Sequence, residues 1–201
     1  MKSLLLTDGM VRAVLAGLKT KTRRPLKPQP DEGRKGSFSC PFGQVGDRLW
    51  IRETFCLEHQ VESDQPPPFT DGRPIRWEFA GMESDPEGAD SMWLQPHYRA
   101  TDPTPELSYY GSEEEPTVRW KSSIHMPRWA SRITLEITEI RVERVQEITE
   151  EEAISEGFFP DDGVSEVYCF SEAWDSLYAK KGLGWYANPW VWVLTFRRVE
   201  G

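Results

Sequence analysis

The chain lacks a long hydrophobic run. No segment approaches the roughly 20 consecutive apolar residues that a transmembrane helix needs. The first residues, MKSLLLTDGM, contain only a short apolar run before Asp8, so we expect no secretory signal. The sequence therefore predicts a cytoplasmic protein with no membrane partner.

Cysteine and histidine are also scarce. The chain has 3 cysteines and 3 histidines, and an odd number of cysteines cannot all pair. Cys56 and His59 have chelating spacing, but no second pair completes a zinc site. Glycine-rich phosphate loops and nucleophile-elbow motifs are absent from the sequence as well. We predict free thiols, no metal and no cofactor.

Positive charge is in deficit overall and is unevenly placed. The chain has 24 Lys+Arg against 33 Asp+Glu and a net charge of -9, which argues against a protein coated with nucleic acid. Residues 1–35 hold 9 basic and 3 acidic residues, which leaves 24-9=15 basic and 33-3=30 acidic residues elsewhere. An acidic body with one basic patch favours a small or locally gripped anionic ligand. A charge asymmetry kept for solubility explains the same numbers.

The spacing of apolar residues predicts few helices and several short strands. In chain order we expect a helix ending at Gly17, a strand over 49–55, a long strand over 133–145 with a register break near Glu139, a helix from Thr149 to Gly157, a helix from Ser171 to Gly182, and a closing strand over 188–199. This pattern predicts an α+β fold, with a small, mostly antiparallel β-barrel and flanking helices.

Residues 58–118 differ in composition from the rest of the chain. They are rich in proline and acidic residues, with short strand-like pieces such as IRWEFA and HYRA between them. Long loops inside a compact domain are usually functional covers or poorly ordered segments. We predict a single domain over residues 1–201 that carries 58–118 as an acidic, proline-rich, partly ordered insertion.

The segment GLKTKTRR offers the clearest chemistry. Lys19 and Thr22 are three residues apart, so on a helical turn their side chains would meet. A threonine hydroxyl becomes a nucleophile when a base takes its proton, and a lysine deprotonated by desolvation or neighbouring cations is such a base. Lys21, Arg23 and Arg24 supply those cations, or hold a phosphate or an oxyanion. A basic loop after a helix accounts for the same residues.

Other polar residues join the list of candidates. Arg52 and Glu53 face opposite sides of a strand, so one of them points inward and needs a partner, unless the strand is a solvated edge. Glu152 and Glu156 lie on one helix face, and a carboxylate at the helix end, as at Glu156, suits an acid/base role. Trp129, in a segment of aromatic, hydroxyl and basic residues, stacks a base or belongs to the core.

Taken in order, these motifs resemble a known family. AGLKTKTRR, VGDRLWIRETF, SIHMPRWASRITLEITEIRVERVQEITEEEAISEGF and NPWVWVLTFRRV are similar to the ASCH domain, a relative of the PUA RNA-binding fold. The similarity is greatest to ASCH-domain proteins encoded in tailed phages and prophages, and it covers residues 1–57 and 119–199. It implies a small β-barrel with flanking helices, and a protein at work in a bacterial host cell.

The resemblance also implies site residues. The family has a G-x-K-x-x-T-x-R element facing a cleft, and Gly17, Lys19, Thr22 and Arg24 match it. In one bacterial branch, amidohydrolases that deacetylate N4-acetylcytidine, the lysine and threonine of this element react together with a later glutamate. Carried over, the reacting triad is Lys19, Thr22 and Glu156. This chain departs from that branch because it is about twice as long and carries the acidic insertion.

Three functions follow from these patterns. The first is an amidohydrolase for an acylated nucleoside, with Lys19, Thr22 and Glu156 as the triad and with Arg24, Lys21, Arg52, Glu53 and Trp129 binding the substrate. The second is a non-catalytic module that grips RNA or a nucleotide in a cleft with its basic segment. The third is a phage assembly or structural protein. In the first two, Lys19 and Thr22 point toward the cleft, whereas Lys21 and Arg23 point away from it.

Overall fold

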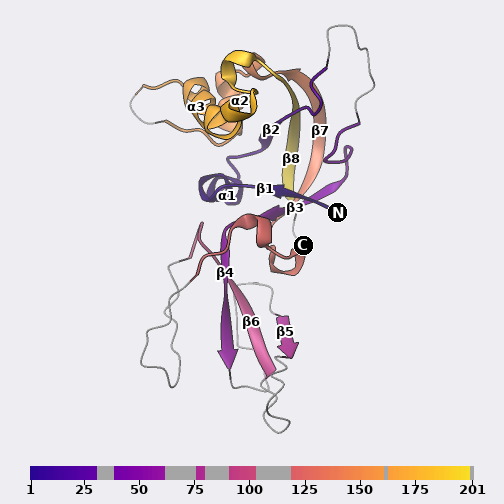
Figure 1. The fold of residues 1–201 in the computed structure, drawn as a ribbon, viewed down its shortest axis with the longest axis vertical. Helices are drawn as coiled ribbons and strands as arrows, with labels where there is room; N and C mark the ends of the chain where they lie inside the picture. The colour runs from indigo at the N-terminus through magenta and orange to yellow at the C-terminus, as the bar shows by residue number, and fades with distance from the viewer. Residues whose placement is uncertain (31–38, 62–75, 80–90, 103–118, 161–162, 200–201) are drawn as a thin grey trace. The chain divides into compact units, whose positions relative to one another are not determined.

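The computed structural model describes residues 1–30, 39–61, 76–79, 91–102, 119–160 and 163–199. These residues contain eight strands and three α-helices, with six consecutive strands between the first two helices (Figure 1). The strands are β1 (Lys2–Leu5), β2 (Lys21–Pro25), β3 (Arg48–Arg52), β4 (Phe55–Val61), β5 (Arg76–Phe79), β6 (Ser91–Tyr98), β7 (Thr134–Arg144) and β8 (Trp190–Val199). The helices are α1 (Asp8–Leu15), α2 (Glu150–Ser155) and α3 (Glu166–Tyr178).

The strands form two sheets, with orders β1-β3-β7-β8-β2 and β4-β6-β5. The predicted α+β composition is present, but the predicted β-barrel is wrong: neither sheet closes on itself within the described residues. A closed barrel would require β1 and β2, the outer strands of the larger sheet, to pair with each other. Instead β2 pairs with β8, and β1 is hydrogen-bonded only to β3, so the sheet stays open.

The chain divides into two compact units. Unit 1 comprises Met1–Ser3, Gly9–Leu49 and Thr134–Glu200, and unit 2 comprises mainly Leu4–Asp8 and Trp50–Ile133. Strands β1 and β3 contribute residues to both. The predicted single domain over 1–201 stays a prediction, and most of the predicted insertion, at 62–75, 80–90 and 103–118, lies outside the described residues.

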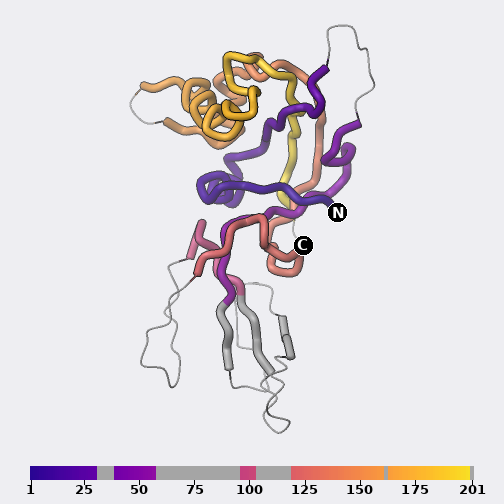
Figure 2. Tube along the Cα trace, in the orientation of Figure 1, coloured from indigo at the N-terminus to yellow at the C-terminus, as the bar shows by residue number. Residues whose placement is uncertain are grey.

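In unit 1 the sheet is built around the long antiparallel pair of β7 and β8. Its register shifts between Ile137 and Glu139, as the break in alternation predicted. Strand β2, from the N-terminal part of the chain, runs antiparallel to β8, from the C-terminal part, and the two lie side by side in the trace (Figure 2). This pairing brings the basic GLKTKTRR segment next to the end of the chain.

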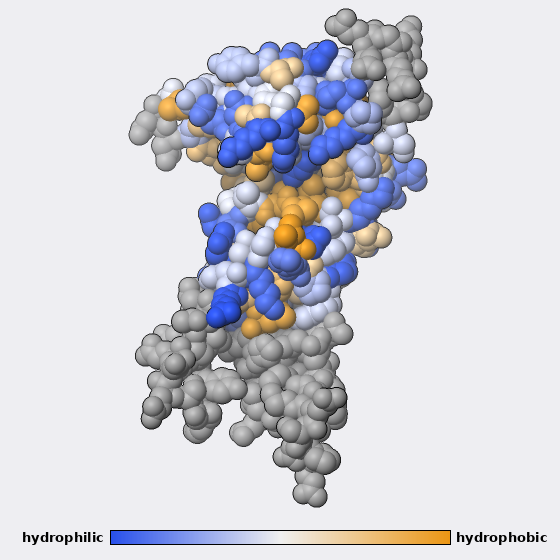
Figure 3. Space-filling model, in the orientation of Figure 1, coloured by the Kyte–Doolittle hydropathy of each residue, from blue (hydrophilic) through white to orange (hydrophobic). Residues whose placement is uncertain are grey.

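Helices α2 and α3 cover one face of this sheet. Their buried side chains pack on residues of β8 and of the turn that follows β7: Val145, Ile148, Ala153, Phe170, Trp174, Val191 and Val193. Phe170 lies edge-on to Phe158 at 5.6 Å and adds an aromatic contact to this core. On the face seen in Figure 3, hydrophilic residues cover most of the outer surface of these helices.

Local sequence sets the ends of the helices in unit 1. Helix α1 ends before Gly17, whose φ of +74° no other residue adopts readily. Thr149 caps α2 by accepting a hydrogen bond from the amide of Glu152, as its capping pattern predicted. Helix α3 begins at Glu166, because Ser165 is its cap; the predicted start at Ser171 is wrong by more than one turn.

Unit 2 contains the antiparallel sheet β4-β6-β5. The strand-like pieces noted in the sequence correspond to β5 and to the end of β6. Phe55, Tyr98, Met126 and Ala130 form a small core beside it, and Trp129 packs against that core. Within 58–118 the described residues form these strands and a turn at 99–102, and the predicted long loops lie outside the described residues.

Candidate functional site

Three basic residues of the GLKTKTRR segment meet two glutamates of the α2 region in unit 1. Lys19 Nζ lies 2.9 Å from Glu156 Oε2, and both residues are only 2% exposed. Lys21 Nζ lies 2.8 Å from Glu152 Oε1. The guanidinium of Arg23 contacts carboxylate oxygens of both glutamates, at 3.3 Å in the case of Glu156 Oε1. Residues about 130 positions apart in the chain thus form one charged cluster.

Strand β7 completes this cluster with Arg141 and Glu143. Glu143 accepts hydrogen bonds from Arg23 Nη2 at 2.6 Å and from Arg141 Nε at 2.8 Å. Arg141 also pairs with Glu152. Burial by itself would raise the pKa of Glu152, but hydrogen bonds from Lys21 and Arg141 and the charge of Arg23 outweigh it and lower the pKa to about 2. Glu152 is therefore ionised at neutral pH.

The ammonium of Lys19 has all three of its N–H donors occupied. Besides Glu156 Oε2, it donates to the carbonyl oxygens of Glu156 and Lys21, each at 2.7 Å. The Glu156 carbonyl lies at the C-terminal end of α2, where carbonyl groups lack a partner within the helix and a cation is favoured. Burial lowers the pKa of Lys19, the carboxylate of Glu156 raises it, and the net direction is downward.

Gly157 allows this close approach of α2 to Lys19. Its φ is +95°, and a Cβ built on it would lie 3.2 Å from Ala13 Cβ and 3.6 Å from Lys19 Cβ. The amide of Thr20 also donates to the Ser155 carbonyl at 2.8 Å. The backbone after α1 is thus hydrogen-bonded directly to the end of α2.

Strand geometry separates Thr22 from the glutamates. Residues 21–25 form β2, not a helical turn, so the expected helical contact of Lys19 with Thr22 is wrong. Side chains alternate along a strand, and the glutamates contact Lys21 and Arg23, so Thr22 and Arg24 leave the opposite face. The expectation that Arg23 points away from the site is also wrong, because Arg23 is 1% exposed and contacts the same carboxylate as Lys19.

At the free edge of β2, Lys19 nevertheless contacts the backbone directly before Thr22. The amide of Phe196 donates to the Thr20 carbonyl and that of Leu26 to the Trp190 carbonyl, so the even-numbered residues of β2 face β8. The backbone groups of Lys21 and Arg23 therefore face the free edge. Lys19 Nζ binds the Lys21 carbonyl there, on the peptide group directly before Thr22.

Arg24 bonds to Thr22 around the same edge. Its Nη1 donates to Thr22 Oγ1 at 2.7 Å and to the Arg23 carbonyl at 2.8 Å. Because that carbonyl faces the free edge, the hydroxyl of Thr22, which is fully buried, also lies toward the edge. Arg24 thus links the Thr22 hydroxyl to the free edge of β2, where Lys19 binds the Lys21 carbonyl.

The remaining predicted site residues, Arg52, Glu53 and Trp129, lie in unit 2. Arg52 donates to the carbonyls of Ser123 and Ile124. Glu53 is 1% exposed and accepts two hydrogen bonds from Arg132, at 3.0 and 2.8 Å. Burial raises the pKa of Glu53, although the hydrogen bonds from Arg132 oppose the shift. The inward charge on this strand is therefore Glu53, and its predicted need for a partner is met by Arg132.

Sequence reasoning gave no site role to Glu143 or Arg141, and it noted Glu152 only for its spacing to Glu156. The i, i+4 spacing of Glu152 and Glu156 predicted that they share a face, and Arg23 contacts both of them. Arg141 and Glu143 are two apart on β7 and therefore face the same side. Nothing in the sequence places that side of β7 against α2, since this depends on the order of the strands.

Within the residues described, no group of three or more His, Cys, Asp or Glu side chains is arranged to hold a metal ion. No helix in these stretches is long and apolar enough to cross a membrane. The three cysteines are free thiols.

Comparison with known proteins adds little to this description. No family model matches the chain, and no curated protein matches it. A crystal structure of protein EF3133 from Enterococcus faecalis V583, of the family DUF984, is similar at 11% identity with a TM-score of 0.44. The match covers 99% of this chain and 80% of that one.

Proposed function

We propose that this protein is an amidohydrolase that removes an acyl group from a modified nucleoside such as N4-acetylcytidine. The observation that carries the proposal is the buried Lys19–Glu156 pair at the free edge of β2, one peptide group away from Thr22. Burying two opposite charges costs free energy that a structural role rarely requires, and pairs of titratable groups in such positions often serve catalysis.

Lys19 and Glu156 supply the base and the acid. Burial disfavours the charged form of Lys19 and lowers its pKa. Transfer of one proton from Lys19 Nζ to Glu156 therefore costs less free energy than it would in water. The neutral amine then takes the proton of the Thr22 hydroxyl, and the protonated Glu156 gives its proton to the departing amine. Acylation thus returns Lys19 to its ammonium form and Glu156 to its carboxylate form.

Thr22 is the nucleophile in this scheme. Its oxygen attacks the acyl carbon, the carbon–nitrogen bond breaks, and the nucleoside leaves as the free amine with an ester left on Thr22. For hydrolysis, Lys19 again passes a proton to Glu156 and takes one from water; the hydroxide cleaves the ester, the carboxylic acid leaves, and Glu156 returns a proton to Thr22 Oγ1. One amide and one water give one acid and one amine, so the atoms balance without a cofactor.

Two groups at the β2 edge stabilise the oxyanion. The amide of Arg23 faces the edge directly after the nucleophile, and the guanidinium of Arg24 already lies 2.7 Å from Thr22 Oγ1. Thr22, Lys19 and Glu156 are each at most 2% exposed. Binding of the acyl group therefore requires movement of the side chains that cover them.

The geometry favours this hypothesis over a phosphate grip by the same basic segment. Lys19, Lys21 and Arg23 are each paired with glutamates of the α2 region. A phosphate would have to displace those carboxylates from buried positions, which costs free energy that exposed lysines would not require.

The test is incubation of the protein with N4-acetylcytidine, with release of cytidine followed by chromatography. We expect turnover by the native chain, retention of some activity in Thr22→Ser, and none in Thr22→Val, which keeps the shape and removes the hydroxyl. Thr195→Val, on the neighbouring strand β8, is the matched control and should remain active. Unchanged substrate at high enzyme concentration would reject this substrate, and an active Thr22→Val variant would reject the mechanism.

A further inference from the structure

Unit 1 has a pocket that the reaction above does not use. Its volume is about 320 Å³, and it is lined by Met1, Lys2, Phe42, Asp47 and Arg48. Lys2 comes from β1, Arg48 begins β3, and Phe42 and Asp47 come from the turns before β3. Ligand pockets generally span about 300–1,000 Å³, so this pocket suits one small molecule rather than a polymer.

The two basic side chains of this pocket, Lys2 and Arg48, have no acidic partner among the residues that the structure describes. Neither Lys2 nor Arg48 makes a salt bridge or a side-chain hydrogen bond to any residue that the structure describes. On the neighbouring strand β7, Glu136 accepts a hydrogen bond from Arg197 Nη2 at 2.8 Å and is not paired with Arg48. In the charged cluster beside β2, by contrast, Lys19, Lys21 and Arg23 each form an ion pair with a glutamate.

The one carboxylate of the pocket is held by the turn that forms its wall. Asp47 Oδ2 accepts the amide of Gln44 at 2.9 Å. Gly43 has a φ of +128°, and a Cβ built on it would lie only 2.5 Å from that same oxygen. The backbone conformation and the close approach of Asp47 therefore favour glycine at position 43 in the wall that carries Phe42 and Asp47.

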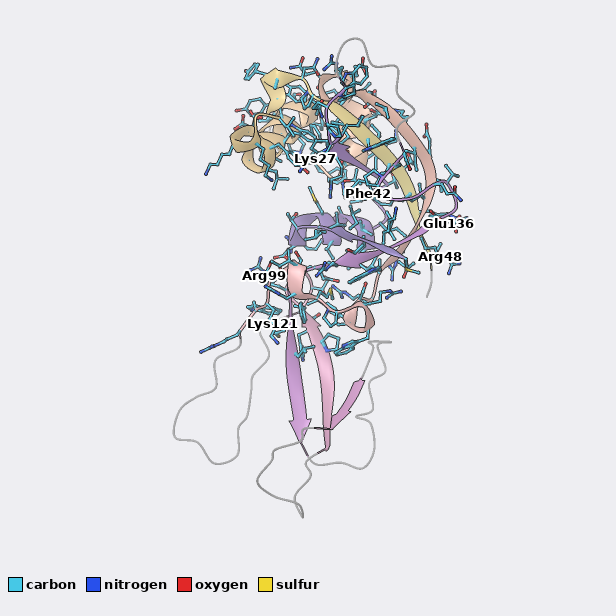
Figure 4. All side chains as sticks on the ribbon, turned by 45° about the vertical axis from the view of Figure 1, so that its right-hand side comes forward. Lys27, Phe42, Arg48, Arg99, Lys121 and Glu136 are labelled. Atoms are coloured by element: carbon cyan, nitrogen blue, oxygen red, sulfur yellow. The ribbon has the colours of Figure 1, made fainter. Side chains whose placement is uncertain are left out.

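Together these groups are complementary to a ring that carries a phosphate. Arg48 and Lys2 supply charge-assisted donors for phosphate oxygens. The half-buried ring of Phe42, labelled in Figure 4, offers a surface for stacking. The second oxygen of Asp47 can accept a hydrogen bond from a hydroxyl or amino group of a ligand. We propose that this pocket binds a nucleoside monophosphate, at a site separate from the β2 edge.

The test is calorimetric titration of the full chain with cytidine monophosphate, cytidine and inorganic phosphate. We expect the monophosphate to bind more tightly than either of the other two, because only it engages the cations and Phe42 together. Raising the salt concentration should weaken binding, since Arg48 is exposed. Equal affinity for inorganic phosphate, or no binding of the monophosphate at low salt, would overturn the proposal.

Variants locate the binding to this pocket. Arg48→Gln should weaken the monophosphate about tenfold or more, because it removes a charge-assisted contact without breaking one within the protein. Lys27→Gln is the control, since Lys27 is an exposed lysine of unit 1 with no partner among the described residues. Equal affinity of the Arg48→Gln variant and the native chain would exclude this pocket.

A second pair of variants separates the contributions of the Phe42 ring and of the Asp47 wall to the affinity from that of the basic side chains. Phe42→Ala should bring the affinity for the monophosphate down to that for inorganic phosphate, and Gly43→Ala should weaken both by displacing Asp47. The Thr22→Val variant should bind the monophosphate as the native chain does. The two proposals can therefore fail independently: loss of the amidohydrolase proposal would not affect monophosphate binding, and absence of monophosphate binding would not affect the amidohydrolase proposal.

Discussion

Replacing Lys19 with methionine tests whether the Lys19–Glu156 pair is as buried as its geometry indicates. Methionine has a similar length and no charge, so the substitution leaves the carboxylate of Glu156 without its ammonium. It also removes the hydrogen-bond donor from two carbonyl oxygens, those of Lys21 and Glu156. Arg23, at 3.3 Å, remains as a counter-charge for Glu156.

The expected loss of stability follows from these contacts. Removing one partner of a buried ion pair costs about 3–5 kcal/mol, because the other charge stays buried without compensation. The two carbonyls left without a donor account for part of that cost, and Arg23 limits the remainder, so we expect about 3 kcal/mol. For a chain of this size, that loss lowers Tm by about 6–12 °C.

The assay is urea unfolding followed by tryptophan fluorescence, in parallel with thermal unfolding. Lys27→Met is the matched control, because Lys27 is exposed, and it should change the free energy of unfolding by less than about 0.5 kcal/mol. The double variant Lys19→Met, Glu156→Gln should recover part of the loss, since it removes both charges. A loss below about 1 kcal/mol for Lys19→Met would refute the description of this pair as buried and dry.

Two further outcomes are expected. The pKa of Glu152 is lowered from 4.5 to about 2, so its ion pairs stabilise the fold above pH 4.5, and this contribution is lost as the pH falls toward 2. The free energy of unfolding of Glu152→Gln should therefore fall less steeply over that pH range than that of the native chain, and an unchanged pH dependence would contradict the assignment. Gly157→Ala should destabilise the fold by about 1–3 kcal/mol, because Gly157 has a φ of +95° and a Cβ there would contact Ala13. Gly9→Ala, in open space in α1, should not destabilise the fold, and similar unfolding midpoints for the two variants would contradict this argument.

Local patterns alone were sufficient to locate most elements of unit 1. Apolar spacing, the cap at Thr149 and the glycine after α1 identified the first two helices, because these features act within a few residues of each other. Alternation in the sequence also revealed the register shift near Glu139, since a change of phase is visible in one strand. The start of α3 was missed because Ser165 and Ser171 both have the chemistry of a cap, and only the fold selects between them.

The site depended on tertiary structure. The residue types Lys19, Thr22 and Glu156 could be chosen from motifs, but their distances could not, because Lys19 and Glu156 meet only through the packing of α2 beside β2. The position of Arg23 was predicted wrongly for the same reason: the alternation of β2 fixes which side chains share a face, and α2 decides which face is buried. Whether the sheet closes is likewise set by strand order, a long-range property that no short segment encodes.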